Sequence, residues 1–162
     1  MLDGAAITTG GLEISRAACA ARLLSARVAI VTGSTSGIGL GIASAHGRVA
    51  SPCRSAYVAA KHGIVGLTKV TALEVAELGI TANAICPGYL WTPLVERQIT
   101  AQARAHGIAR EDVIKNVLLE SQPSKRFATV EEIGALTVFL CSEAAASITG
   151  TALPVDGGWP AH

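Results

Sequence analysis

The chain has almost no net charge, no long apolar run and no paired-cysteine motif. Its 13 Lys and Arg stand against 12 Asp and Glu, so charge gives no case for binding nucleic acid or an anionic membrane. No apolar run approaches the roughly 20 residues of a membrane-spanning helix. The four cysteines show no Cys-x2-Cys spacing, which argues against a disulfide framework or metal site and indicates reduced thiols. We therefore predict a cytoplasmic protein without metal, nucleic-acid or membrane partners.

Hydrophobic residues and glycine are abundant instead. Half of the 162 residues are hydrophobic and 17 are glycine, which suits helices packed closely on a sheet, and the length suffices for one domain. Residues 1–26 carry no motif, and we interpret them as an N-terminal extension ahead of a single domain at 27–162. A mitochondrial presequence is the alternative for the extension, but Asp3 and Glu13 argue against it.

A serine, a tyrosine and a lysine form the most informative pattern. Tyr57 and Lys61 are four residues apart, which places them on one face of a helix, and Ser44 lies 13 residues before Tyr57. An ammonium group beside a phenol stabilises the phenolate, so such a tyrosine can exchange protons with an alcohol or ketone. A serine hydroxyl nearby can hold the substrate oxygen. Because Tyr-x3-Lys alone is more often an ordinary surface pair, the pattern depends on a second motif.

The second motif is the glycine-rich segment from Thr32 to Gly39, with the spacing Gly-x3-Gly-x-Gly. It follows Val28 to Val31, a short apolar run that is typical of a buried strand. A strand, such a turn and a helix start can hold a dinucleotide pyrophosphate, because glycines allow close backbone approach and the helix N-terminus attracts phosphate. A glycine-rich loop alone is a weak signal, since many are plain turns.

Together with two later motifs, these segments resemble the short-chain dehydrogenase/reductase family. The later motifs are Pro87-Gly88, after a predicted strand at 80–86, and Asp156-Gly157-Gly158, after a predicted strand at 152–155. The resemblance covers nearly all of residues 27–162.

The resemblance implies a doubly wound, Rossmann-like α/β fold and a nicotinamide dinucleotide cofactor, for which we expect NAD and keep NADP open. It implies Ser44, Tyr57 and Lys61 as catalytic residues. It also places a set of residues around the cofactor, namely Gly33, Ser36, Gly37, Ile38, Gly39, Tyr57, Lys61, Pro87, Gly88 and Thr92. Of these, Thr92 is the residue that it places against the nicotinamide carboxamide.

The order of the motifs agrees with the family, but the spacing between Gly39 and Ser44 does not. These residues are five apart, whereas the family places several strand–helix units between the two motifs. A βαβ unit takes roughly 30 residues or more, so on the order of a hundred residues are missing. Ile42-Ala43 fits both the start of the first helix and the end of the fifth strand. We interpret the chain as a family member with an internal deletion, joined at this shared sequence.

The deletion removes strands two to five, so the predicted fold is a truncated Rossmann-like fold lacking about four central strands. Residues 28–31 are left without obvious neighbours, whereas the predicted strands at 80–86 and 152–155 can still pair. The residue that distinguishes NAD from NADP is lost with strand two. The family's catalytic asparagine also lies in the missing part, because neither Asn83 nor Asn116 matches its position.

A narrower resemblance concerns the substrate. Residues 44–47 and 87–98 are similar to those of bacterial D-3-hydroxybutyrate dehydrogenases, in which a His, a Lys and a Gln hold the substrate carboxylate. Here His46 and Gln98 match, and Arg54 replaces the lysine. Taken singly, His46 fits an ordinary loop residue and Gln98 a solvated helix residue. Their joint match favours a small hydroxy or keto acid as substrate.

The remaining pattern predicts helices. They are a long helix over 54–78 that ends at Gly79, one or two helices after Pro93 with a break at Gly107, and a helix from a Thr129–Glu132 capping box to about Ser142. In the family the first of these often forms the subunit interface, so we expect a homo-oligomer. Four residues give it a broad apolar face, namely Ile64, Leu67, Val70 and Val75.

These patterns predict an oxidoreductase that interconverts D-3-hydroxybutyrate and acetoacetate with NAD. A second hypothesis is a non-catalytic remnant that at most associates through the helix over 54–78. A third is that the join is an artefact of the sequence, which resequencing of the locus would reveal.

Overall fold

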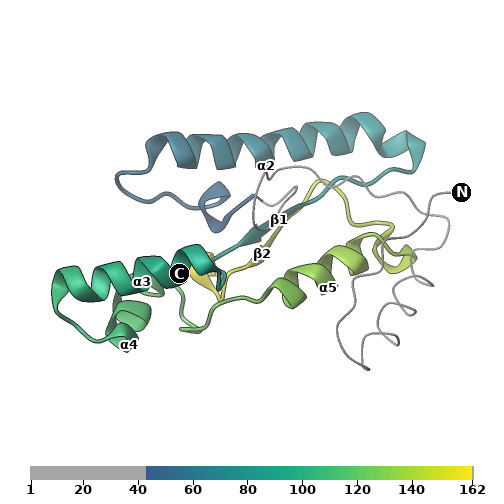
Figure 1. Ribbon diagram of the computed structural model, residues 1–162. Helices are drawn as coiled ribbons and strands as arrows, with labels where there is room; N and C mark the ends of the chain where they lie inside the picture. Colours follow the sequence, from purple (N-terminus) through teal and green to yellow (C-terminus); the bar gives the residue numbers. More distant parts are fainter. Residues whose placement is uncertain (1–42, 162) are drawn as a thin grey trace, which may run out of the picture.

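A computed structural model describes residues 43–161 (Figure 1). The glycine-rich segment, the predicted first strand and the N-terminal extension lie outside these residues. In chain order the elements are the 3-10 turn η1 (Ala45–Gly47), α2 (Ser55–Val75), β1 (Ala84–Pro87), α3 (Pro93–His106), α4 (Arg110–Asp112), a π-helical segment (Val113–Leu118), α5 (Val130–Leu140) and β2 (Ala152–Val155), with 3-10 turns at Ala76–Leu78, Glu143–Ala145 and Trp159–Ala161.

Within the described residues, the sheet consists of β1 and β2, which pair in parallel with Ala84 opposite Ala152 and Pro87 opposite Val155. The predicted strand at 152–155 matches β2 at both ends. The strand predicted at 80–86 is wrong at its start, because β1 begins at Ala84.

The segment before β1 is held by loop contacts instead of a strand ladder. The Ala82 N–H donates to Thr149 Oγ1 over 3.1 Å, and Asn83 Nδ2 donates to the Ile148 carbonyl over 2.7 Å. The Gly150 N–H also donates to the Ala82 carbonyl over 2.7 Å, so the backbone next to β1 is bonded within a loop, and regular strand pairing starts at Ala84.

Ala43 lies along the edge of β1 opposite to β2. Successive residues of a strand point their backbone groups to alternate sides, and Ala84 and Gly88 donate toward the β2 side. The Ile85 carbonyl therefore faces the other edge, where it accepts from the Ala43 N–H over 2.7 Å. Ala43 therefore lies in an extended segment next to β1, and Ile42 is outside the described residues.

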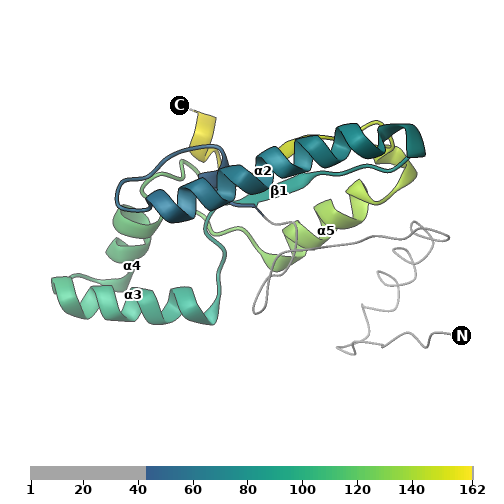
Figure 2. The ribbon, with the colours of Figure 1, turned by 90° about the horizontal axis from the view of Figure 1, so that it is seen from above.

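Helices α2 and α5 lie on opposite sides of the strands, and Figure 2 shows α2 running over β1 (Figures 1 and 2). The contact under α2 is apolar, since Ile64 and Val65 pack against a buried cluster of Ala43, Ala84 and Cys86. The fold is therefore α/β with parallel strands between helices, as expected for a Rossmann-like fold that lacks central strands.

The helix boundaries follow the sequence signals closely. α2 ends at Val75 and continues as a 3-10 turn to Leu78, where Gly79 takes a left-handed φ of 68°. α3 ends the same way at Gly107, with φ of 63°. Thr129 and Glu132 form both hydrogen bonds of a capping box before α5. Glycine supplies these left-handed turns without steric cost, which makes them visible in the sequence.

The apolar residues of α2 are divided between two faces. Ile64 packs toward β1, but Leu67, Val70 and Leu73 are 65%, 51% and 80% exposed. A second apolar cluster instead lies under α3, where Ile99 packs against Val113 and Leu118 of the π-helical segment.

Among residues 43–161, no helix is both long and apolar enough to cross a membrane.

Candidate active site

Ser44 stands at the point where the segment beside β1 turns into η1. Its extended backbone makes it the N-cap of η1, and its Oγ accepts from the His46 N–H over 3.2 Å. Gly88 follows β1 directly, and its N–H bonds to β2. Ser44 and Gly88 therefore lie at the carboxyl ends of neighbouring extended segments, where open α/β folds place their ligands.

Tyr57 and Lys61 lie on the first turns of α2, on the face above η1. The Lys61 Nζ is 5.5 Å from the centroid of the Tyr57 ring, which is within the range of a cation–π contact. Tyr57 is 45% exposed. The close packing of η1 under α2 is visible at Gly47, where an added Cβ would lie 2.9 Å from the Lys61 carbonyl oxygen.

These residues meet in a cavity of about 220 Å³. Six of the predicted site residues are among those that line it, namely Ser44, His46, Arg54, Tyr57, Gly88 and Thr92. They come from η1, from the start of α2 and from the segment after β1. The lining of the cavity does not include Lys61, Pro87 or Gln98. The Lys61 ammonium does, however, contact the ring of Tyr57, which lines the cavity. The predicted cofactor residues between Gly33 and Gly39 lie outside the described residues.

Thr92 has a structural contact in addition to its place in the cavity wall. It is the N-cap of α3, and its Oγ1 accepts from the Val95 N–H over 3.2 Å. This bond uses one lone pair of the hydroxyl, so the hydroxyl proton remains available to an acceptor in the cavity.

His46 is the most buried polar residue of the cavity wall, at 5% exposure. Its Nε2 lies 2.9 Å from Ser51 Oγ and its Nδ1 lies 3.4 Å from Ser44 Oγ. Burial, and secondly the positive charge of Arg54, lower the pKa of His46. Both effects disfavour the imidazolium.

Two aromatic residues that the motifs did not identify, Tyr89 and Trp159, complete the cavity wall. The Trp159 ring meets the His46 ring edge-on at 5.0 Å and stacks on Tyr89 at 6.0 Å. Asp156 Oδ1 accepts from the Trp159 N–H over 3.2 Å, which holds this residue after the Asp-Gly-Gly turn. Their positions directly after the Pro-Gly and Asp-Gly-Gly motifs, in a chain with six aromatic residues, are the signal that could have identified them.

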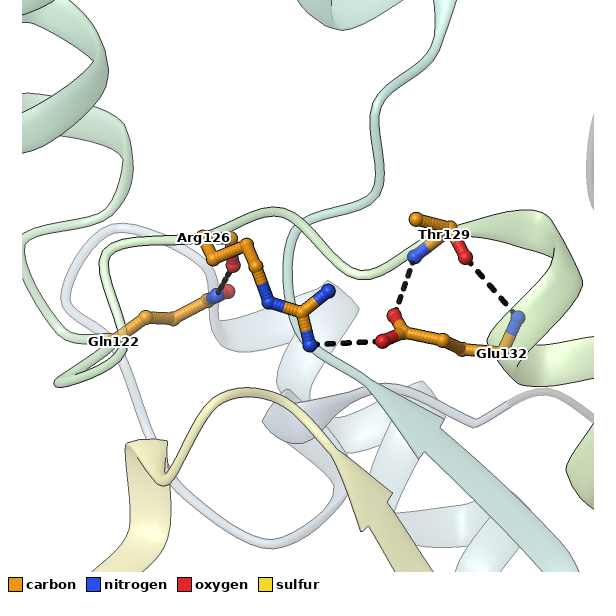
Figure 3. A network of polar contacts seen from close by, with 4 residues as sticks. All are labelled: Gln122, Arg126, Thr129 and Glu132. Atoms are coloured by element: carbon orange, nitrogen blue, oxygen red, sulfur yellow. Dashed lines mark hydrogen bonds and ion pairs between the residues drawn. The ribbon is translucent and has the colours of Figure 1, made fainter.

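A larger hollow of about 320 Å³ lies beside the end of β2, lined in part by Arg126, Glu132 and Asp156. Figure 3 shows that two of its charged groups, Arg126 and Glu132, are paired with each other: Arg126 Nη2 donates to Glu132 Oε1 over 2.8 Å, and the other carboxylate oxygen accepts from the Thr129 N–H over 2.8 Å. Gln122 in turn donates to the Arg126 carbonyl over 3.0 Å. These bonds hold the start of α5, so the smaller cavity, with Ser44 and Tyr57, is the better candidate for chemistry.

Comparison with known proteins gives the same class of protein. A family profile described as enoyl-(acyl carrier protein) reductase matches residues 13–160. The chain is 62% identical to a D-beta-hydroxybutyrate dehydrogenase of Rhizobium meliloti strain 1021 over 123 residues, which are 76% of this chain and 48% of the relative. The chain belongs to the short-chain dehydrogenase/reductase family, and it spans about half the length of the curated relatives it matches.

Solved structures support the fold. A short-chain dehydrogenase family protein from Francisella tularensis subsp. tularensis SCHU S4 aligns with a TM-score of 0.68 at 33% identity, over 75% of this chain and 50% of that protein. The F189W variant of actinorhodin polyketide ketoreductase, solved with NADPH, aligns with a TM-score of 0.65 at 32% identity, over 75% of this chain and 46% of that protein.

Proposed function

We propose that this chain carries the acid–base and substrate-binding part of an NAD-dependent oxidoreductase that interconverts D-3-hydroxybutyrate and acetoacetate. The observation that carries the proposal is the single cavity that joins Ser44 with Arg54 and Tyr57 at the start of α2 and with Thr92 after β1. The high identity to a D-beta-hydroxybutyrate dehydrogenase supports the substrate class. The described cysteines, Cys53, Cys86 and Cys141, are free thiols, which supports a cytoplasmic location.

Each side chain would have a separate role in alcohol oxidation. Ser44 Oγ would hold the substrate oxygen while Tyr57 accepts the hydroxyl proton. The Lys61 ammonium, close to the Tyr57 ring, would stabilise the phenolate that accepts this proton. Arg54 would bind the substrate carboxylate, with Gln98 of α3 as a further contact once the substrate is present.

A nicotinamide dinucleotide would supply the hydride acceptor. The described residues fit its nicotinamide end, because Gly88 and Thr92 line the same cavity as Tyr57 and the Thr92 hydroxyl keeps its proton for an amide oxygen. Gly33, Ser36, Gly37, Ile38 and Gly39 would hold the pyrophosphate. We expect NAD over NADP from the substrate resemblance, and the NADPH-bound ketoreductase makes NADP the alternative to test.

Replacement of Tyr57 tests the proposal. Turnover of D-3-hydroxybutyrate, followed by NADH absorbance, should fall at least about 100-fold in Tyr57→Phe, because general acid–base catalysis contributes about 10²–10⁴-fold. Ser55→Ala, an exposed change in the same helical turn, is the matched control and should keep full activity. Turnover that survives in Tyr57→Phe would refute the assignment.

A thermal melt with and without NAD(H) tests the fold and the cofactor together. Ligand that binds the native state stabilises it, so the midpoint of a cooperative transition should rise with NAD(H). Absence of a cooperative transition in both samples would show that the chain does not form the proposed enzyme by itself.

The exposed face of α2 supports a second candidate function, association with another chain. Leu67, Val70 and Leu73 are at least half exposed and lie on one side of the helix, a pattern typical of an interface. In this case the chain associates through α2 with a second copy or an intact relative, without turnover. Size-exclusion chromatography with light scattering should show a species larger than the monomer that Leu67→Glu with Leu73→Glu dissociates. A compact monomer that turns over substrate would refute this candidate.

A further inference from the structure

Gln122 is a fully buried polar residue that belongs to none of the sequence motifs and is not among the residues that line the cavity. Its Oε1 accepts from the Tyr89 N–H over 2.6 Å, and its Nε2 donates to the Arg126 carbonyl over 3.0 Å, the bond drawn in Figure 3. A backbone N–H can only donate and a carbonyl can only accept, so these two partners determine the orientation of the amide. Gln122 therefore holds two backbone positions that are far apart in the chain.

The two positions are the ends of a mostly helical segment. This segment, residues 90–125, follows β1 and contains α3, α4 and the π-helical segment. Its ends also meet directly, because the Ala128 N–H donates to the Tyr89 carbonyl over 3.0 Å and Leu90 pairs with Ala128 in an isolated parallel bridge. The side chain of Gln122 thus joins the point where the chain enters the helical segment to the point where it leaves.

Two motif glycines leave the space that this side chain occupies. A Cβ at Gly88 would collide with Gln122 Oε1, and a Cβ at Gly157 would lie 3.4 Å from Gln122 Nε2. The amide therefore packs directly against the backbone of the Pro-Gly and Asp-Gly-Gly motifs. Any side chain at Gly88 would displace it, which gives a physical reason for glycine at this position.

The backbone that Gln122 holds continues into one wall of the cavity. Tyr89 and Thr92 both line the cavity, and the Tyr89 ring stacks on Trp159 at 6.0 Å with an angle of 4° between the rings. The bond to the Tyr89 N–H fixes the first residue of this wall. Because Gln122 does not itself line the cavity, its effect on a bound molecule is exerted through Tyr89 and the residues that follow.

We propose that Gln122 is a positioning residue, which holds the two ends of the helical segment together and so fixes the cavity wall of Tyr89 and Thr92 for substrate binding. Loss of the amide leaves a buried N–H and a buried carbonyl unpaired, which frees this wall to move. The effect on the substrate rests on the proposed function. The two Gln122 bonds are a property of the folded chain and can be measured without turnover.

NMR of the backbone amide of Tyr89 tests the bond. The chain has two tyrosines, so labelling with ¹⁵N-tyrosine gives two backbone signals, and the one that persists in Tyr57→Phe is that of Tyr89. In the wild type its proton should lie downfield and exchange slowly with deuterated water, because it is bonded over 2.6 Å. In Gln122→Met it should move upfield and exchange at least about tenfold faster. Gln102→Met, the same change on α3 at a residue whose Oε1 has no partner, should leave the signal unchanged.

Steady-state kinetics tests the positioning. In Gln122→Met the KM for D-3-hydroxybutyrate should rise about tenfold while kcat stays within about twofold, because a wall that binds the substrate is lost and Ser44 and Tyr57 are untouched. Gln102→Met should keep both constants. Thr129→Ala, which weakens the cap of α5, is the control for lost stability and should keep the wild-type KM. If Gln122→Met does not fold, Gln122→Asn, which shortens the side chain but keeps the amide, should show the same change with a smaller rise in KM.

Rapid exchange of the wild-type Tyr89 amide would overturn the inference, and so would a Tyr89 signal that Gln122→Met leaves unchanged. A lower stability with an unchanged KM would show that Gln122 has a structural role only. An equal rise of KM in Thr129→Ala would assign the effect to general destabilisation. A protected Tyr89 amide in a chain without turnover would contradict the proposed function but not the bond to Gln122.

Discussion

Helices α2 and α5 flank the same pair of strands, but different interactions hold them in place (Figure 1). α5 begins with a complete capping box, in which Thr129 and Glu132 satisfy each other's backbone N–H groups. α2 has Arg54 at its N-cap and no side-chain capping bond. Its position comes from the contact of its inner face with η1 and β1. α5 is thus defined mainly by its own sequence, and α2 mainly by its neighbours.

The candidate catalytic residues of the helices lie on α2, the helix whose position depends on packing. Tyr57 and Lys61 start α2, and the cavity is formed where this helix lies over η1. A helix whose start is fixed by tertiary contacts holds the site only while those contacts persist. Mutations under α2 should therefore affect the site and the stability together, whereas mutations at the cap of α5 should affect stability alone.

The largest expected effect comes from Gly47, under α2. In Gly47→Ala the new Cβ would lie 2.9 Å from the Lys61 carbonyl oxygen and 3.0 Å from Val65 Cγ2, so the helix must shift. We expect a loss of about 1–3 kcal/mol in the free energy of unfolding, typical of overpacking, measured by urea denaturation. Gly66→Ala is the control on the outer face of α2, where a Cβ meets nothing within 4 Å. It should stabilise the helix by about 0.5–1 kcal/mol. Equal stability of the two variants would contradict the dependence of α2 on its inner contacts.

A smaller effect is expected at the cap of α5. Thr129→Ala removes the acceptor of the Glu132 N–H, a bond of 3.1 Å, and should cost about 1 kcal/mol in the free energy of unfolding. Thr129→Ser keeps the hydroxyl and should restore most of the stability. Turnover should be unchanged in Thr129→Ala, whereas it falls in Tyr57→Phe. An equal loss of turnover in the two variants would contradict the independence of the α5 cap from the site.

The smallest effect is the pH dependence of the same cap. The hydrogen bond from Arg126, and secondly the Thr129 N–H, lower the pKa of Glu132 in the folded chain. The stabilisation is therefore complete above the ordinary pKa of glutamic acid and is lost as the pH falls through the lowered pKa. The stability difference between wild type and Glu132→Gln should be present at pH 7 and shrink in acid, as measured by denaturation at a series of pH values. A difference that grows in acid would contradict the assigned cause.

Much of the fold could be predicted because its signals are local. Gly79 and Gly107 end helices through left-handed backbone, and the Thr129–Glu132 box starts one, since these effects depend on adjacent residues only. The start of β1 could not be predicted, because Ala82 bonds to Thr149 and Asn83 to Ile148, residues far along the chain, in a loop. The division of the apolar residues of α2 between two faces could not be predicted from the pattern either, because Ile64 and Leu67 are both strongly apolar and only the position of β1 decides which of them packs inward.

The sequence by itself determined the family and the helix ends and named Ser44, Tyr57 and Lys61 as candidate site residues, because each depends on residue type and short spacing. The tertiary structure decided what surrounds them. It placed Trp159 against His46 from the other end of the chain, and it set Ser51 on the far nitrogen of that ring. Contacts of this kind join segments whose separation in the chain carries no periodic signal, so only the folded arrangement of η1, α2 and the strands reveals them.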